Sequence, residues 1–263
     1  MRIVARWRSG VLAALIMAAG TALAQAPAPD ASSAPPAPAP TSPGPTATPA
    51  APPAAAVEAG SIERVAGSVL ISVGGVSRAA RQGERLNVGE LLITEAGAEA
   101  LLRLRDQSTL ALRPASRVLV SDLRLQDPGG DALATNLLRG SLRYVSGLIA
   151  RARPQGVVFR TPTATVGIRG TDFEIAIVPD GERDRAGVYN FVHDGQTNVS
   201  LPSGEALDVA RDQTGFAPDN PQPGEPALQL LRERPAFLRG GGFDAMMQQV
   251  GRPPPPIFMP RMR

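Results

Sequence analysis

Proline is distributed very unevenly along this chain of 263 residues. Eleven of the 27 prolines lie at positions 25–56 and ten at positions 218–263, so only six fall in the 160 residues from 58 to 217. Proline interrupts helices and central strands alike. The sequence therefore predicts one folded domain at 58–217, between a linker at 25–57 and a tail at 218–263 that are both mostly disordered.

Composition excludes several classes of site. The chain has no cysteine, and His193 is its one histidine, so neither disulfides, cysteine zinc sites nor multi-histidine metal sites can form. All 27 basic residues are arginine, and the 24 that follow position 24 balance 24 acidic residues. The part of the chain after position 24 therefore has no net charge and offers no global field for phosphate groups. We expect no cofactor, no metal and no nucleic-acid partner.

Residues 1–24 have the three-part layout of a secretory signal peptide. A short basic segment precedes an apolar run at 11–20, and Ala22-Leu23-Ala24 supplies the small residues of a cleavage site. The alternative is a membrane anchor, but residues 11–24 would span roughly 21 Å as a helix, against a hydrocarbon core of about 30 Å. We expect export to the periplasm or surface of a bacterium, with no transmembrane segment in the mature chain.

The two proline-rich flanks are expected to have different roles. Alanine and proline make up 23 of the 32 residues at 25–56, which favours an extended spacer over a proline-rich ligand for a partner groove. In the tail, residues 227–234 are expected to form two helical turns and residues 243–250 another short helix. The alternative to a disordered tail is a docking peptide with methionines and Phe258 as apolar anchors.

The proline-poor middle alternates apolar and polar residues with a period of two. Residues 100, 102 and 104 share one face, and Leu110 and Leu112 point inward on the next predicted strand. Turn signals recur every 8–12 residues or so, and Asp194-Gly195 is a two-residue hairpin signal. The best helix-like run, at 132–138, is short. This pattern predicts an all-β domain built as a sandwich, a barrel or a solenoid.

Residues 159–173 read FRTPTATVGIRGTDF. This segment resembles the signature of the FecR domain family, Thr-Pro-x-Ala-x-x-Gly-[Val/Ile]-Arg-Gly-Thr-x-Phe. The matching positions are Thr161, Pro162, Ala164, Gly167, Ile168, Arg169, Gly170, Thr171 and Phe173.

Three upstream segments also resemble the family, at 86–94, 100–114 and 136–140, and Gln107 stands where the family usually has glycine. The resemblance covers roughly residues 61–215. It implies a single FecR-like domain of short strands and tight turns, with a β-solenoid or sandwich-like arrangement.

The nine motif positions are interpreted as mainly architectural. Pro162 restricts Thr161 to an extended conformation, and Gly167 and Gly170 permit positive φ, so the motif predicts a tight corner between strands. Arg169 is expected to donate to backbone carbonyls freed by that corner. The alternative is that Arg169 contacts an anion or a partner.

Catalysis is not expected, and three residues were weighed for it. His193 next to Asp194 is interpreted as a turn residue rather than a general base, because no nucleophile elbow precedes it. Asp172 and Glu174 share a strand face, as the carboxylates of glycosidases can, but such pairs are common on solvated faces.

The family's regulators carry a cytoplasmic anti-sigma segment, and only ten residues precede the apolar run here. The resemblance therefore implies a stand-alone exported member without sigma-factor control. We expect a non-catalytic binding or sensing module of the cell envelope that contacts a protein or a glycan. The alternatives are a structural or adhesin-type envelope protein and, less favoured, a hydrolase.

Overall fold

The computed structural model describes residues 56–126, 130–239 and 243. The chain divides into two units, 1–51 and 52–263, and every described residue lies in the second. Strands make up 56% of the described residues and helices 7%, which confirms the all-β prediction. The signal peptide and most of the linker predicted above lie outside the described residues.

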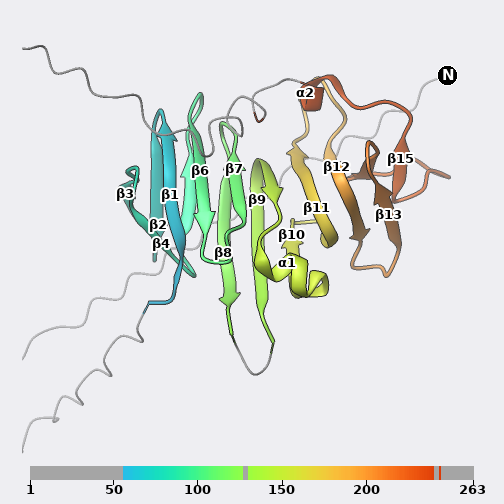
Figure 1. Ribbon diagram of the computed structural model, residues 1–263. Helices are drawn as coiled ribbons and strands as arrows, with labels where there is room; N and C mark the ends of the chain where they lie inside the picture. Colours follow the sequence, from blue (N-terminus) through green and yellow to red (C-terminus); the bar gives the residue numbers. More distant parts are fainter. Residues whose placement is uncertain (1–55, 127–129, 240–242, 244–263) are drawn as a thin grey trace, which may run out of the picture. The chain divides into compact units, whose positions relative to one another are not determined.

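The described residues form fifteen strands and three short helices (Figure 1). The strands are β1 (Glu58–Ala66), β2 (Val69–Val73), β3 (Val76–Ala79), β4 (Arg85–Asn87), β5 (Leu91–Thr94), β6 (Glu99–Leu104), β7 (Thr109–Leu112), β8 (Arg117–Arg124), β9 (Ala132–Val145), β10 (Val157–Arg160), β11 (Thr165–Val178), β12 (Gly187–Ser200), β13 (Ala206–Ala210), β14 (Thr214–Pro218) and β15 (Gln229–Leu231). The helices are α1 (Leu148–Ala152), the 3₁₀ helix η1 (Pro154–Gly156) and α2 (Ala236–Arg239).

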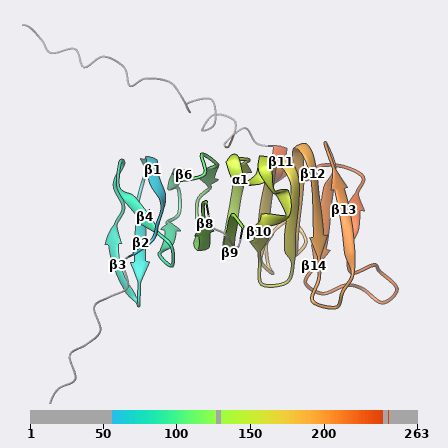
Figure 2. The same ribbon diagram turned by 60° about the horizontal axis from the view of Figure 1, so that its bottom comes forward.

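Three strands of 14 residues each, β9, β11 and β12, connect two ladders of hydrogen-bonded strands. Ladder A runs β3-β2-β5-β8-β9-β10-β11-β12-β13 and uses the first halves of β9 and β11 with the second half of β12. Ladder B runs β4-β1-β6-β7-β9-β11-β12-β14-β15 and uses the opposite halves. Figure 2 shows this succession from a second direction, from β1–β4 to β12–β14.

A glycine with positive φ lies near the middle of each of the three long strands: Gly140, Gly170 and Gly195, at 79°, 65° and 79°. Glycine adopts this conformation without the steric cost that a Cβ brings, so the strand can bend from one ladder into the other. Five strands close into a barrel, and the others extend it. The solenoid or sandwich-like arrangement implied by the family resemblance is therefore corrected to a barrel, one of the architectures that the alternation pattern left open.

The main core lies between the ladders. Side chains from both ladders belong to a single buried cluster, including the inward faces predicted for β6 and β7. At its centre Tyr144, Phe159 and Phe173 come from three adjacent strands, with ring centroids 4.9, 5.1 and 5.6 Å apart. Three aromatic rings in mutual contact add specific geometry to the burial of apolar area.

The best helix-like run of the sequence is a strand, as the all-β prediction requires, and one local prediction in the middle of the chain is wrong. The helix-like run at 132–138 is part of β9, because the four-residue spacing of Leu133 and Leu137 is also a multiple of the strand period, and these side chains point inward between β8 and β10. Asp194-Gly195 does not turn the chain. β12 continues through it, because Gln196 and the following residues stay paired with β11.

The predicted tail also differs from expectation. Residues 229–231, expected to be helical, form β15, because they extend ladder B by pairing with β14. The expectation of disorder does not hold for residues 219–239, where Leu238 is 2% exposed. The helix expected at 243–250 lies outside the described residues except for Phe243. In the described part of the chain, no helix is both long and apolar enough to cross a membrane.

Candidate functional site

The family-like motif begins in the turn between β10 and β11. The backbone amide of Thr161 donates to the carbonyl of Ala164 at 2.8 Å, and the Thr161 hydroxyl oxygen accepts from the Ala164 amide at 3.0 Å. Pro162 is exposed at the tip of the turn, whereas Ala164 is buried. These three residues close the hairpin and start β11 in register with β10.

The middle of the motif bends the β11–β12 hairpin. Between the pairs Arg169–Gln196 and Asp172–Asp194, β11 carries one residue more than β12, and directly afterwards β12 carries one extra residue, His193. Two adjacent bulges increase the local twist and turn both strands into ladder B. The predicted corner is therefore a bend inside continuous strands.

The two motif glycines have different roles. Gly170 has a φ of 65°, as predicted for a corner. Gly167 pairs regularly with Val158 and Asn198, and it is not among the glycines with positive φ. The prediction that Gly167 uses positive φ is wrong, because β11 runs straight at this position.

Arg169 lies on the rim of a groove at this bend. Its side chain is exposed, and no hydrogen bond or ion pair joins it to the described residues, so the expected bonds to backbone carbonyls are not formed. The groove has a volume of about 590 Å³ and is lined by α1, η1 and β11. Arg151 faces it as the second arginine, and the half-buried Pro154 supplies apolar surface above Ala150 and Ile168, which are 0% and 4% exposed.

A second family-like segment positions the other wall of this groove. At the β6–β7 turn, Oδ1 of the buried Asp106 accepts from the amide and the hydroxyl of Ser108 at 3.1 and 2.5 Å. The Asp106 carbonyl then accepts from the Leu148 amide, at the start of α1, at 2.7 Å. A Cβ on Gly147 would lie 2.3 Å from that carbonyl oxygen, so only glycine fits there. The turn thus fixes the helix that carries Arg151.

The groove is suited to an anionic ligand. Its lining contains two guanidinium groups and no carboxylate. Arginine offers a planar fork of donors that matches carboxylate and phosphate groups. The apolar surface between the arginines would contact the non-polar part of the same ligand. Figure 1 shows α1 next to β10 and β9, where the chain passes between the ladders.

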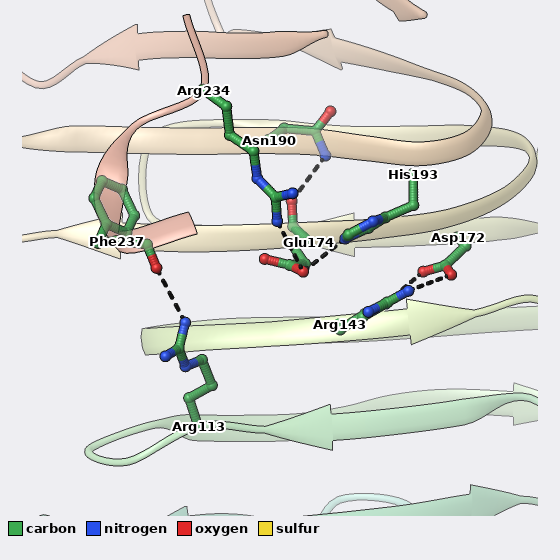
Figure 3. Close-up of polar contacts among 8 residues, drawn as sticks. All are labelled: Arg113, Arg143, Asp172, Glu174, Asn190, His193, Arg234 and Phe237. Carbon is green, nitrogen blue, oxygen red and sulfur yellow. Dashed lines mark hydrogen bonds and ion pairs between the residues drawn. The ribbon is translucent and has the colours of Figure 1, made fainter. Parts of the chain in front are cut away.

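The residues weighed for catalysis lie on the outer face of ladder B, away from the groove lining (Figure 3). Asp172 accepts two hydrogen bonds of 2.7 Å from the guanidinium of Arg143, which lies on the neighbouring strand β9. Oε1 of Glu174 lies 2.6 Å from Nε2 of His193 and 3.5 Å from the guanidinium of Arg234. The Glu174 side chain is 3% exposed.

This arrangement holds the acids in internal pairs. A bidentate arginine restrains Asp172, and the buried Glu174 is covered by Arg234, which also stacks over the Phe191 ring at 3.8 Å from its centroid. His193 is the extra residue of the β12 bulge rather than the tip of a hairpin. The Asn190 side chain on β12 donates to the Glu174 carbonyl on β11 at 3.2 Å and so links the two strands next to the Glu174–His193 pair.

Sequence reasoning missed Arg143, Arg151 and Arg234. Every basic residue of the chain is arginine, so no local signal separates these three from the other 24. The partners of Arg143 and Arg234 lie on β11, and Arg151 lines the groove from α1, so only the tertiary structure brings these residues to their neighbours. No group of three or more metal-ligating side chains occurs within the described residues.

Comparisons with known proteins agree with the motif. Residues 90–206 match the family model described as FecR protein. Two solved crystal structures of a candidate anti-sigma factor from Parabacteroides distasonis ATCC 8503 are similar, with TM-scores of 0.44 and identities of 14% and 13%. Each match covers 60% of this chain and 64% of the solved chain, less than two thirds of its length. A comparison with curated proteins gave no match.

Proposed function

The chain carries a FecR domain, and from this premise we propose that it is a non-catalytic binding and sensing module of the bacterial cell envelope. Its partner is an envelope protein that presents an acidic segment to the groove between Arg151 and Arg169. The observation that supports this proposal is the convergence of two family-like segments on one groove. The β6–β7 turn fixes α1 and Arg151, and the β11 bend displays Arg169.

Arg169 is the motif residue whose exposure favours a binding role. The turn residues hydrogen-bond to each other and Phe173 packs in the core, so architecture accounts for them. Arg169 is solvent-exposed and contributes to neither. A hydrogen bond to a charged group contributes about 1.5–3 kcal/mol, so loss of one arginine contact would weaken binding roughly 10- to 150-fold.

A protein partner is favoured over a glycan because the groove combines charge with apolar surface. Pro154 is the accessible apolar residue of its lining, and Ala150 and Ile168 lie buried beneath it. An extended acidic peptide with one or two apolar side chains fits both properties, whereas a sugar chain would leave the apolar surface without a partner.

Non-catalytic function is supported by the pairing of the acidic residues. A glycosidase needs two carboxylates that reach the same bond. Here Asp172 is held by Arg143, and Glu174 is buried beneath Arg234. Export is supported by the signal-peptide layout of residues 1–24.

Photo-cross-linking in living cells tests the proposal. A photoreactive residue replaces Gln155, an exposed and uncharged residue of the groove, in the full chain at native expression. We expect capture of an envelope protein, and we expect Arg151→Glu with Arg169→Glu to reduce it at least tenfold.

The matched control is Arg117→Glu with Arg139→Glu. These two arginines are exposed, paired across β8 and β9, and outside the groove lining. This variant has the same net charge and should retain capture. Equal loss of capture in both variants would show that the effect comes from the overall charge of the protein and not from the groove. Sedimentation with purified peptidoglycan sacculi that depends on the groove arginines would instead favour a structural, glycan-bound role.

A further inference from the structure

The outer face of ladder B carries an apolar cluster of its own, separate from the main core. It contains Tyr189 and Phe191 on β12, Phe216 on β14, and Ala176 and Val178 on β11. Tyr189 stacks on Phe216 with ring centroids 4.4 Å apart. Large aromatic side chains on the outside of a sheet require a cover.

Residues 228–239, which we call the strap, provide this cover. β15 within the strap pairs with β14, and Leu238 is buried in the cluster. The Phe237 ring meets the Tyr189 ring edge-on at 5.2 Å. The strap therefore combines strand addition to β14 with apolar side chains that enter the cluster.

Two polar contacts fix the direction of the strap (Figure 3). Arg234 lies over Phe191 and forms an ion pair of 3.5 Å with the buried Glu174. Arg113 on the loop after β7 donates to the carbonyl of Phe237 at 3.1 Å. Along the strap, Arg234 therefore pairs with the buried carboxylate of Glu174, and the carbonyl of Phe237 accepts a hydrogen bond from Arg113.

Apart from Leu238, the apolar side chains of the strap are only partly buried: Leu228 packs against the main core, and Leu231 and Phe237 pack against the outer cluster. Leu238 is its one fully buried side chain, and β15 is three residues long and pairs on one side. Glu233 and Arg239 are exposed. Strand addition at a sheet edge gives affinity through main-chain hydrogen bonds and specificity through alternate side chains. The face beneath the strap has all the features of such a binding site.

We infer that the outer face of ladder B is a peptide-binding surface that the strap occupies as an internal ligand. Its external ligand is a segment of a partner protein that adds a strand to β14 and then presents an arginine, followed three and four residues later by an aromatic residue and leucine. The strap supplies these groups as Arg234, Phe237 and Leu238. This surface shares no residue with the Arg151–Arg169 groove, so the inference is independent of the proposed function.

The test measures binding of a fluorescent synthetic peptide with the sequence of residues 228–239 to the full chain. The internal strap competes at an effective concentration in the millimolar range. We therefore expect weak binding to the unchanged protein and at least tenfold tighter binding to the variant Arg234→Ala with Leu238→Ala, whose own strap is weakened. A peptide with glutamate in place of the arginine should not bind the variant, because it would meet Glu174.

Hydrogen exchange of the β14 amides that pair with β15 is measured on the same variant. Faster exchange without peptide binding would overturn the inference, because the exposed face would then have no affinity for the strap sequence. Unchanged exchange would overturn it as well, because the strap would then be a fixed part of the fold. Binding of the glutamate peptide with equal affinity would show that Glu174 does not select the ligand.

Discussion

Alanine at the two glycines of the Val-Gly-Ile-Arg-Gly segment is expected to change stability in opposite directions. Gly170 has a φ of +65°, and no atom lies within 4 Å of the position that its Cβ would take. The left-handed backbone itself is then the cost, about 1–2 kcal/mol for a residue with a Cβ. We expect Gly170→Ala to reduce the free energy of unfolding by this amount.

Gly167 lies in a regular part of β11, where the nearest atom to an added Cβ is the Asn198 carbonyl oxygen at 3.9 Å. That distance is an ordinary van der Waals contact. Glycine inside a strand costs about 0.5–1 kcal/mol relative to alanine, because the unfolded chain is more flexible. Gly167→Ala is therefore expected to raise the free energy of unfolding by roughly this amount.

Urea unfolding at 25 °C, followed by far-ultraviolet circular dichroism, measures both free energies. A change of 1 kcal/mol corresponds to a shift in Tm of about 2–4 °C for a domain of this size. Gly170→Asn is the control, because asparagine tolerates the left-handed region, and it should lose less stability than Gly170→Ala. Equal destabilisation by alanine at both glycines would refute the argument from φ.

Three further outcomes are expected. Gln107 has a φ of 64°, so Gln107→Gly should raise the free energy of unfolding by about 1 kcal/mol in urea; a loss would contradict the backbone argument. Phe159→Ala removes the middle ring of the aromatic core and should cost about 3–5 kcal/mol in the same assay, whereas a loss below 1 kcal/mol would show that the core is not packed as described. Hydrogen bonds from Arg185 lower the pKa of Glu225 to about 2, and an NMR titration of its carboxyl carbon should show this value in the folded protein and a rise toward 4.5 in Arg185→Ala. Because the pKa is lowered on folding, the stabilisation is complete above pH 4.5 and is lost as the pH falls toward 2.

The alternation pattern predicted those features of the fold that depend only on residues close together in the sequence. A side chain two positions along a strand returns to the same face, so the inward positions of β6 and β7 could be assigned without knowing their partners. The turn at Thr161–Ala164 was not predicted, because proline and threonine restrict their own backbone without showing that the chain reverses there, although its hydrogen bonds join residues three apart. Of the two motif glycines predicted to use positive φ, Gly170 does and Gly167 does not, because glycine permits this conformation without requiring it.

The same reasoning could not decide between helix and strand where two periods coincide, and it failed where a distant strand decides. Leu133 and Leu137 fit both a helix and a strand, and only pairing with β8 and β10 selects the strand. The signal at Asp194-Gly195 is typical of a hairpin, but β11 offers a continuing partner, and the chain forms a bulge instead of a turn. A local signal cannot report a neighbour that is far away in sequence.

The sequence by itself determined the strand-rich class and the inward faces, because these follow from side-chain spacing, and it pointed to Gly170 as a residue able to adopt positive φ. Only the tertiary structure decided which arginines form ion pairs or line the groove. Arg143 meets Asp172, Arg234 covers Glu174, and Arg151 faces Arg169 across a groove. Each of these contacts depends on strand register and on the crossing between the ladders. The sequence around a charged residue does not show which distant residue will lie next to it.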